Sequence, residues 1–272
     1  MKYALINGEK TEAANGSRGF CPSCGSELIA KCGEVKINHW AHKGKRNCDP
    51  WWENETEWHR NWKNKFPEEW QEEIHTDPKS GEKHIADVRA KDGLVLEFQH
   101  SYIKPEEQRS REAFYKRMVW IVDGTRLKRD FPRFLKGMKD AMTVKERIYS
   151  TDFPEEVFPK AWVESEVPVI LDFGRGTLAD DPHLKIKQNL YCLLPIRSNF
   201  GFEMYIAEFS RKPFIENVIN CEFFKRSYIF WKQVVVEEQG RLKRMEIERK
   251  QAANRAFAAL TNRKISRRRR IF

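Results

Sequence analysis

The 272-residue sequence lacks any run of about 18 apolar residues, the length that a membrane-spanning helix needs. Its opening, Met1 to Lys10, has no apolar stretch typical of a secretory signal. Cysteine is scarce, with six in the whole chain, which excludes a disulfide scaffold. These absences predict a cytoplasmic protein with no membrane partner. Because 40% of the residues are hydrophobic, the chain can nevertheless build a core, and wholesale disorder is excluded.

Four of the six cysteines lie between residues 21 and 48, which favours a metal site in a reducing compartment. Cys21 and Cys24 are spaced so that both thiolates can reach one ion, and Gly25 allows the tight turn of a zinc knuckle. The alternative is a set of reduced, buried cysteines, and Cys32 has no obvious partner. Two further zinc ligands come from three candidates that spacing alone does not separate: His39, His42 and Cys48.

The residues that follow alternate between helical and strand patterns. Residues 52–66 read as a helix that turns Trp58, Trp62 and Phe66 toward a core. Strands are predicted at 71–76, 83–90 and 94–101, then a helix at 105–117 and a buried strand at 118–122. The order helix, three strands, helix, strand predicts an α/β fold with a mixed sheet flanked by helices.

The second half of the chain carries weaker signals. Extended segments at 167–173, 190–195 and 204–209 predict a β-rich region, and residues 237–260 read as a helix. The predicted organisation is therefore a zinc-binding module at 1–50, an α/β domain at 51–148, a β-rich region of unknown role at 149–236 and a basic helical tail at 237–272.

Positive charge is concentrated at the carboxyl end. Residues 241–272 contain twelve Lys or Arg and two Glu, a net charge of +10 that equals the net charge of the whole chain. A basic tail on a neutral body predicts salt-dependent attraction to a nucleic-acid backbone, and the alternative is a solvated helix without a partner. The densest part of the tail is Arg267, Arg268, Arg269 and Arg270.

The most informative segment spans residues 85–99. Alternation places Ala86, Val88 and Ala90 on one face of the first strand and Leu94, Leu96 and Phe98 on one face of the second. A two-residue turn would mix polar and apolar residues on that face. A three-residue loop at 91–93, with its glycine in the left-handed conformation, keeps the face apolar and sets Asp87 directly across from Glu97.

Two carboxylates so placed repel each other. A hard divalent cation such as Mg²⁺ or Mn²⁺ relieves the repulsion, because it prefers oxygen ligands and can bridge both side chains. Gln99 follows on the same face as Glu97. The alternative is an exposed strand face on which the acids pair with Arg89 or Lys83.

Flanking helices offer further polar side chains. Glu55, His59 and Lys63 recur at helical spacing and form a stripe beside the tryptophans, either aimed at the acids or simply paired on a helix surface. Arg111 and Tyr115, one helical turn apart, provide donors suited to a phosphate.

This series of motifs resembles the nuclease domain of the CoiA-like competence proteins, a branch of the PD-(D/E)XK superfamily, over about residues 1 to 125. The motifs follow the family's order: Cys21-x-x-Cys24, His39-Trp40-Ala41-His42, Glu55-x-x-x-His59-x-x-x-Lys63, Ile85-Ala86-Asp87-Val88, Glu97-Phe98-Gln99, Arg111-x-x-x-Tyr115 and Val119-Trp120-Ile121-Val122.

The resemblance implies a PD-(D/E)XK-like domain at 51–148 and a Mg²⁺-dependent nuclease that hydrolyses DNA. Asp87 and Glu97 would bind the metal, with Glu55 in support. Gln99 stands where the superfamily usually has lysine, a substitution usual among the CoiA-like relatives, and His59 or Lys63 would compensate for it. The expected setting is DNA processing in transformation or recombination, or defence against foreign DNA. The alternative is a non-catalytic, zinc-containing nucleic-acid-binding protein, and RNA ranks lower as a substrate.

Overall fold

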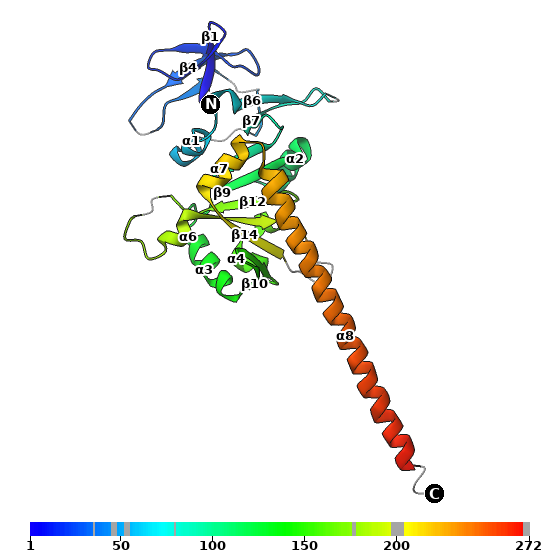
Figure 1. Cartoon of the computed structure of the whole chain (residues 1–272). Coiled ribbons are helices and arrows are strands. Elements are labelled where there is room, and N and C mark those ends of the chain that lie inside the picture. The colour runs from blue at the N-terminus through cyan, green and yellow to red at the C-terminus, as the bar shows by residue number, and fades with distance from the viewer. Residues whose placement is uncertain are drawn as a thin grey trace.

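Figure 1 presents the computed structural model of the chain. It describes residues 1–34, 36–44, 48–51, 55–78, 80–175, 178–196 and 204–268, with side chains as far as residue 259.

The amino-terminal module is a small antiparallel sheet around a core of its own. Its first strand, at residues 3–6, ends in a turn in which Asn7 and Gly8 have φ angles of 53° and 87°. Leu28 and Trp40 fill the centre of the module. The strands lie in the order β2-β1-β3-β4-β5. Their bounds are Tyr3–Ile6 (β1), Glu9–Glu12 (β2), Arg18–Phe20 (β3), Glu27–Lys31 (β4) and His39–His42 (β5).

The rest of the folded body is organised by one nine-stranded mixed sheet in the order β10-β11-β14-β13-β12-β9-β8-β7-β6. Strand β9 pairs in parallel with both β8 and β12, and the other pairings are antiparallel. The bounds are Gln71–Thr76 (β6), Lys83–Arg89 (β7), Val95–Gln99 (β8), Met118–Asp123 (β9), Met142–Lys145 (β10), Ile148–Thr151 (β11), Val169–Asp172 (β12), Asn189–Leu194 (β13) and Met204–Ser210 (β14).

Helices cover both faces of this sheet. Val119 and Ile121 of β9 pack into the core under α1, α7 and the start of α8, while Trp120 and Val122 pack into the core under α2, α3, α4 and α5. Burial on both faces explains the unbroken apolar run of β9. The helices are Glu57–Lys63 (α1), Pro105–Tyr115 (α2), Asp130–Asp140 (α3), Pro154–Val157 (α4), Lys160–Val163 (α5), Leu184–Gln188 (α6), Arg211–Ile219 (α7) and Ile229–Arg268 (α8), with the short 3₁₀ turn η1 (Glu68–Trp70) and the π-helix η2 (Phe223–Tyr228).

The α/β prediction is confirmed, as are all the predicted strands to within two residues at their ends. The predicted helix at 52–66 is wrong in length, because α1 begins only at Glu57. Thr56 has extended backbone angles, and its side chain accepts a hydrogen bond from the backbone N–H of His59. This N-cap starts the helix there and leaves Glu55 outside it. Residues 52–54 lie outside the described part of the chain.

The strands on either side of residue 148 share one sheet. The predicted boundary falls at the first residue of β11, whose partner β14 belongs to the predicted β-rich region. The division into domains stays a prediction.

Helix α8 extends far from the body in Figure 1 and carries the basic tail. Among its described side chains, those of the first turns anchor it, where Trp231, Val234 and Val235 are buried in the core. Residues 243–259 are all exposed. Over the described residues, no helix combines the length and the apolar character that crossing a membrane requires.

Candidate functional site

Three cysteines and one histidine meet at one edge of the amino-terminal module. Cys21 and Cys24 lie in the turn after β3, His42 ends β5, and Cys48 follows in the chain. Their four ligand atoms all lie within 4.8 Å of one another. The Sγ atoms of Cys21 and Cys48 are 3.5 Å apart, and Cys24 Sγ is 3.3 Å from His42 Nε2. A tetrahedron with Zn–S bonds of about 2.3 Å has edges close to these lengths.

The turn that carries the first two cysteines has the predicted geometry. Gly25 has a φ of 71°, and its N–H donates to the carbonyl oxygen of Cys21 at 2.9 Å. Burial raises the pKa of the Cys21 thiol to about 12, so a cation is needed to hold this sulfur as a thiolate. The donor set fits a structural Zn²⁺.

The structure separates the two candidate histidines. His39 and His42 are three residues apart on β5, so the alternation of a strand directs their side chains to opposite faces. His39 Nδ1 lies 2.9 Å from the carbonyl oxygen of Ile37, and His39 is not part of the Cys/His group. Of the five predicted ligands, the structure therefore brings together Cys21, Cys24, His42 and Cys48.

A second cluster surrounds a small cavity of about 60 Å³ between α1, α2 and the β7–β8 hairpin. Within the described residues, Asp87 and Glu97 in this cavity are not joined by a third carboxylate, His or Cys in a compact group like that of Cys21, Cys24, His42 and Cys48. Six of the residues singled out in the sequence line this cavity: Glu55, His59, Lys63, Asp87, Glu97 and Arg111.

Asp87 and Glu97 have the predicted register. Val88 pairs with Leu96 and Arg89 with Val95, which sets Asp87 opposite Glu97. The connection is the expected three-residue loop: Ala90 N–H donates to Leu94 O at 2.8 Å, and Gly93 has a φ of 82°.

Each carboxylate also accepts a backbone N–H from the other strand. Asp87 N–H donates to Glu97 Oε1 at 3.2 Å, and Phe98 N–H donates to Asp87 Oδ2 at 3.0 Å. The two acids are therefore held side by side on one face of the sheet.

The other oxygens of the two acids meet basic side chains. Asp87 Oδ1 is 2.8 Å from His59 Nε2, and the Arg111 guanidinium donates to Glu97 Oε2 at 2.9 Å. Burial and the neighbouring charge of Asp87 raise the pKa of Glu97 to about 8. Burial also opposes ionisation of Asp87, but His59 and Lys63 outweigh it and lower the pKa of this acid. One acid is thus ionised while the other resists ionisation, an imbalance that a bound divalent cation would relieve.

Glu55 and Lys63 are occupied with each other rather than with the paired acids. Lys63 Nζ, with 2% of its side chain exposed, is 2.8 Å from Glu55 Oε1 and 2.8 Å from Glu72 Oε1. Arg60 forms a fork with both oxygens of Glu55, at 2.8 and 2.7 Å. Burial is outweighed by Lys63 and Arg60, which lower the pKa of Glu55. Glu55, His59 and Lys63 thus all line the cavity, but only His59 contacts a paired acid, while Glu55 and Lys63 pair with each other.

Other predicted residues have different surroundings. Gln99 is buried, on the same face as Glu97, and its side-chain N–H groups donate to Ser101 O at 3.2 Å and Ser101 Oγ at 3.3 Å. Tyr115 is buried beside Trp51 and Phe114 rather than turned to a surface where a phosphate could bind. In the tail, the side chains of Arg267 and Arg268, and all of Arg269 and Arg270, lie outside the described residues.

Two further acids, not predicted from the sequence, lie in the cavity wall. Asp49 accepts backbone N–H groups from Trp51 and Ile85 at 2.9 and 2.8 Å. Glu72 has a φ of 49° and accepts the backbone N–H groups of Lys2 and Tyr3, which fastens β1 to the wall of the cavity. The only signal for Asp49 is its position directly after Cys48.

The structure thus combines an amino-terminal sheet whose Cys₃His cluster could hold a metal ion with a larger α/β body in which paired carboxylates line a cavity. Residues 6–50 match the family model described as Competence protein CoiA, N-terminal domain. The match agrees with the resemblance seen in the sequence, and it covers the amino-terminal module. Searches of curated proteins and of solved structures found no match.

Proposed function

We propose that this protein is a Mg²⁺-dependent nuclease of the PD-(D/E)XK type that hydrolyses phosphodiester bonds in DNA. The observation that carries the proposal is the pairing of Asp87 and Glu97 across β7 and β8, with both side chains lining one cavity. The element order α1-β6-β7-β8-α2-β9 supports it, since it is the order predicted from the sequence and these elements carry the motifs of the resemblance.

Asp87 and Glu97 are the residues that would hold the metal. Mg²⁺ is commonly bound by one or two carboxylates and completes its octahedron with water, so a two-acid site suits it. When bound, the metal lowers the pKa of a coordinated water and neutralises charge on the scissile phosphate.

The surrounding side chains keep these acids in place. His59 contacts Asp87 Oδ1, and Arg111 holds Glu97 Oε2. His59 also compensates best for the missing lysine, because Lys63 is held between Glu55 and Glu72. Arg111 lines the cavity, so its guanidinium can donate hydrogen bonds to a phosphate that enters it.

Cleavage assays test the proposal. The zinc-loaded full-length protein is incubated with supercoiled plasmid and with a labelled single-stranded oligonucleotide, with and without Mg²⁺ or Mn²⁺. Asp87→Asn and Glu97→Gln should lower the cleavage rate by about a hundredfold or more, because each removes a metal ligand. Glu73→Gln is the matched control, since Glu73 lies on neighbouring β6, is partly exposed and pairs with Arg89.

Metal-dependent cleavage that is lost in both site variants and kept in the control supports the proposal. Equal cleavage by Asp87→Asn and wild type would contradict the assignment of the site. A protein that binds DNA but leaves it intact under every condition would instead be the non-catalytic binder. The match of residues 6–50 to the amino-terminal domain of a competence protein favours DNA processing during transformation or recombination as the setting, with defence against foreign DNA as the alternative.

A further inference from the structure

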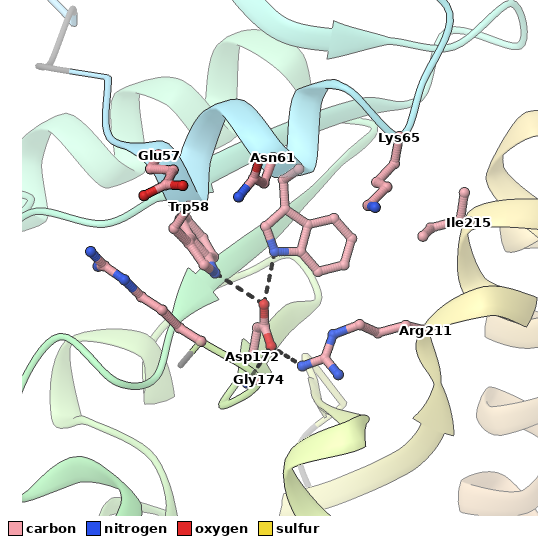
Figure 2. Close-up of a pocket in the computed structure, with 10 residues that line it drawn as sticks. Glu57, Trp58, Asn61, Lys65, Asp172, Gly174, Arg211 and Ile215 are labelled. Atoms are coloured by element: carbon pink, nitrogen blue, oxygen red, sulfur yellow. Dashed lines mark hydrogen bonds and ion pairs between the residues drawn. The ribbon is translucent and has the colours of Figure 1, made fainter. Parts of the chain in front are cut away.

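A second cavity, of about 370 Å³, is lined by Trp58 and Trp62 of α1, whereas His59 and Lys63 of the same helix line the cavity of the paired acids. Figure 2 shows this second cavity. It opens where the parallel strands β9 and β12 end, between α1 and the first turns of α7. Its volume falls in the range of about 300–1,000 Å³ that is common for ligand sites, and the carboxyl ends of parallel strands are where open α/β sheets bind ligands. None of the residues that line it belongs to the cavity of Asp87 and Glu97.

The inner wall of this cavity is built around Asp172, the last residue of β12. Trp58 and Trp62 donate their indole N–H groups to Asp172 Oδ2 at 3.0 and 2.8 Å (Figure 2). The Gly174 N–H donates to Oδ1 at 2.8 Å, and Arg211 pairs with the same oxygen. Asp172 is 4% exposed, so its charge is used to hold the wall and is not available to a cation from solvent. The two indoles give the cavity an aromatic inner side.

Basic side chains stand around this wall. Arg211 Nη1 donates to the carbonyl oxygens of Lys187 and Gln188 at 2.9 Å each, which fixes the guanidinium and leaves its Nε–H for a ligand. Arg175, 44% exposed, is held on one side by Asp123 at 3.2 Å and keeps further N–H groups on its outer side. Lys65 is exposed, and its ammonium makes no ion pair within the described residues.

We propose that this cavity binds a phosphorylated nucleotide unit. Arg175, Lys65 and Arg211 provide N–H donors for the phosphate. Trp58 and Trp62 provide the aromatic surface against which a base packs. Glu57 and Asn61 add an acceptor and an amide at the rim, the groups that recognise the polar edge of a base. The unit is either a free nucleotide or one nucleotide of a strand, and the proposal does not depend on nuclease activity.

Isothermal titration calorimetry on the zinc-loaded full-length protein, without added Mg²⁺ or Mn²⁺, tests the proposal. The probes are 2′-deoxyadenosine 5′-monophosphate, deoxyadenosine, inorganic phosphate and a short single-stranded oligonucleotide. Lys65→Glu should weaken binding of the monophosphate by about tenfold or more, because it replaces a donor to the phosphate with a like charge. Lys212→Glu is the matched control: it makes the same charge change on α7 at a side chain that is 88% exposed and outside the cavity, and its effect should stay below about threefold.

A second variant, Ile215→Trp, fills the cavity without removing a charge and should also weaken binding of the monophosphate. Oligonucleotide that competes with the monophosphate at equal or higher affinity identifies a strand as the source, and competition by free nucleotides alone identifies a free ligand. Three results would overturn the proposal: no binding of the monophosphate, binding no tighter than that of phosphate or deoxyadenosine, or equal losses in Lys65→Glu and Lys212→Glu. Because a monophosphate has no diester bond, failure of this test leaves the nuclease proposal untouched.

Discussion

His39 and His42 stand on the same short strand, but only His42 reaches the three cysteines. The two residues differ by an odd number of positions, so the strand turns them to opposite faces. Residue spacing left the choice of ligands open because Cys48 lies beyond the strand. Its distance from the other ligands therefore cannot be derived from strand alternation.

Zinc content tests this assignment at single residues. The wild-type protein and His39→Ala should each carry about one Zn²⁺ per chain, while His42→Ala and Cys24→Ser should lose most of it, because each of these two removes a ligand. Elemental analysis of the purified proteins by mass spectrometry gives the stoichiometry. Zinc lost from His39→Ala and retained in His42→Ala would reverse the assignment.

Lys63 holds two buried acids, and its removal leaves them without their shared cation. Lys63→Met should lower the free energy of unfolding by about 3–5 kcal/mol, the usual cost of breaking a buried ion pair from one side. Lys65→Met, two residues later on an exposed position, should change it by no more than about 0.5 kcal/mol. Urea unfolding followed by circular dichroism measures both, and equal stability of the two variants would mean that the buried network contributes little.

Among the structural elements, the β7–β8 hairpin was the most predictable. Period-two alternation fixed its buried face, and only a three-residue loop closed by Gly93 kept that face apolar, so local chemistry alone set Asp87 opposite Glu97. Helix α1 was less predictable, because Thr56 caps it one turn later than the tryptophan spacing indicated. The pairing of Arg111 with Glu97 and the place of Asp49 in the cavity wall could not be predicted, because they depend on the packing of α2 and of the segment after Cys48.

Gly93 provides a test at this scale. Its φ of 82° is costly for a residue with a side chain, although a Cβ there would meet no atom within 4 Å. Gly93→Ala should therefore lower the free energy of unfolding by about 1 kcal/mol through backbone strain alone. Gly33→Ala, also at an open position but without a positive φ, should lower it by less than half as much. Equal losses of stability in Gly93→Ala and Gly33→Ala, measured by thermal unfolding, would contradict the left-handed conformation of Gly93.

At the scale of the whole molecule, the amino-terminal module and the large sheet meet at the cavity. Glu72 accepts the backbone N–H groups of Lys2 and Tyr3 while it holds Lys63, so the metal module is tied to the wall of the candidate active site. The sequence indicated both parts but not this junction, because it depends on residues about seventy positions apart. The sequence did not predict that all nine strands join one sheet, because the long-range pairing of β12 with β9 leaves no local pattern.

The positive charge of the molecule is concentrated at one end. Helix α8 carries the basic tail away from the folded body (Figure 1). Residues 243–259 are exposed. Removal of residues 241–272 should flatten the dependence of DNA affinity on salt concentration, since each lost phosphate contact lowers the slope by about 0.7–0.9. Fluorescence anisotropy at several salt concentrations measures the slope for the full-length and shortened proteins. An unaltered slope would mean that the tail does not touch DNA.

The central claim is that Asp87 and Glu97 together hold a divalent cation. Electron paramagnetic resonance of Mn²⁺ added to the zinc-loaded protein measures this binding without any substrate. The account predicts one bound Mn²⁺ per wild-type chain, with at least about tenfold weaker binding in Asp87→Asn and in Glu97→Gln and unchanged binding in Glu73→Gln. Mn²⁺ that binds all four proteins equally, or none of them, would contradict it.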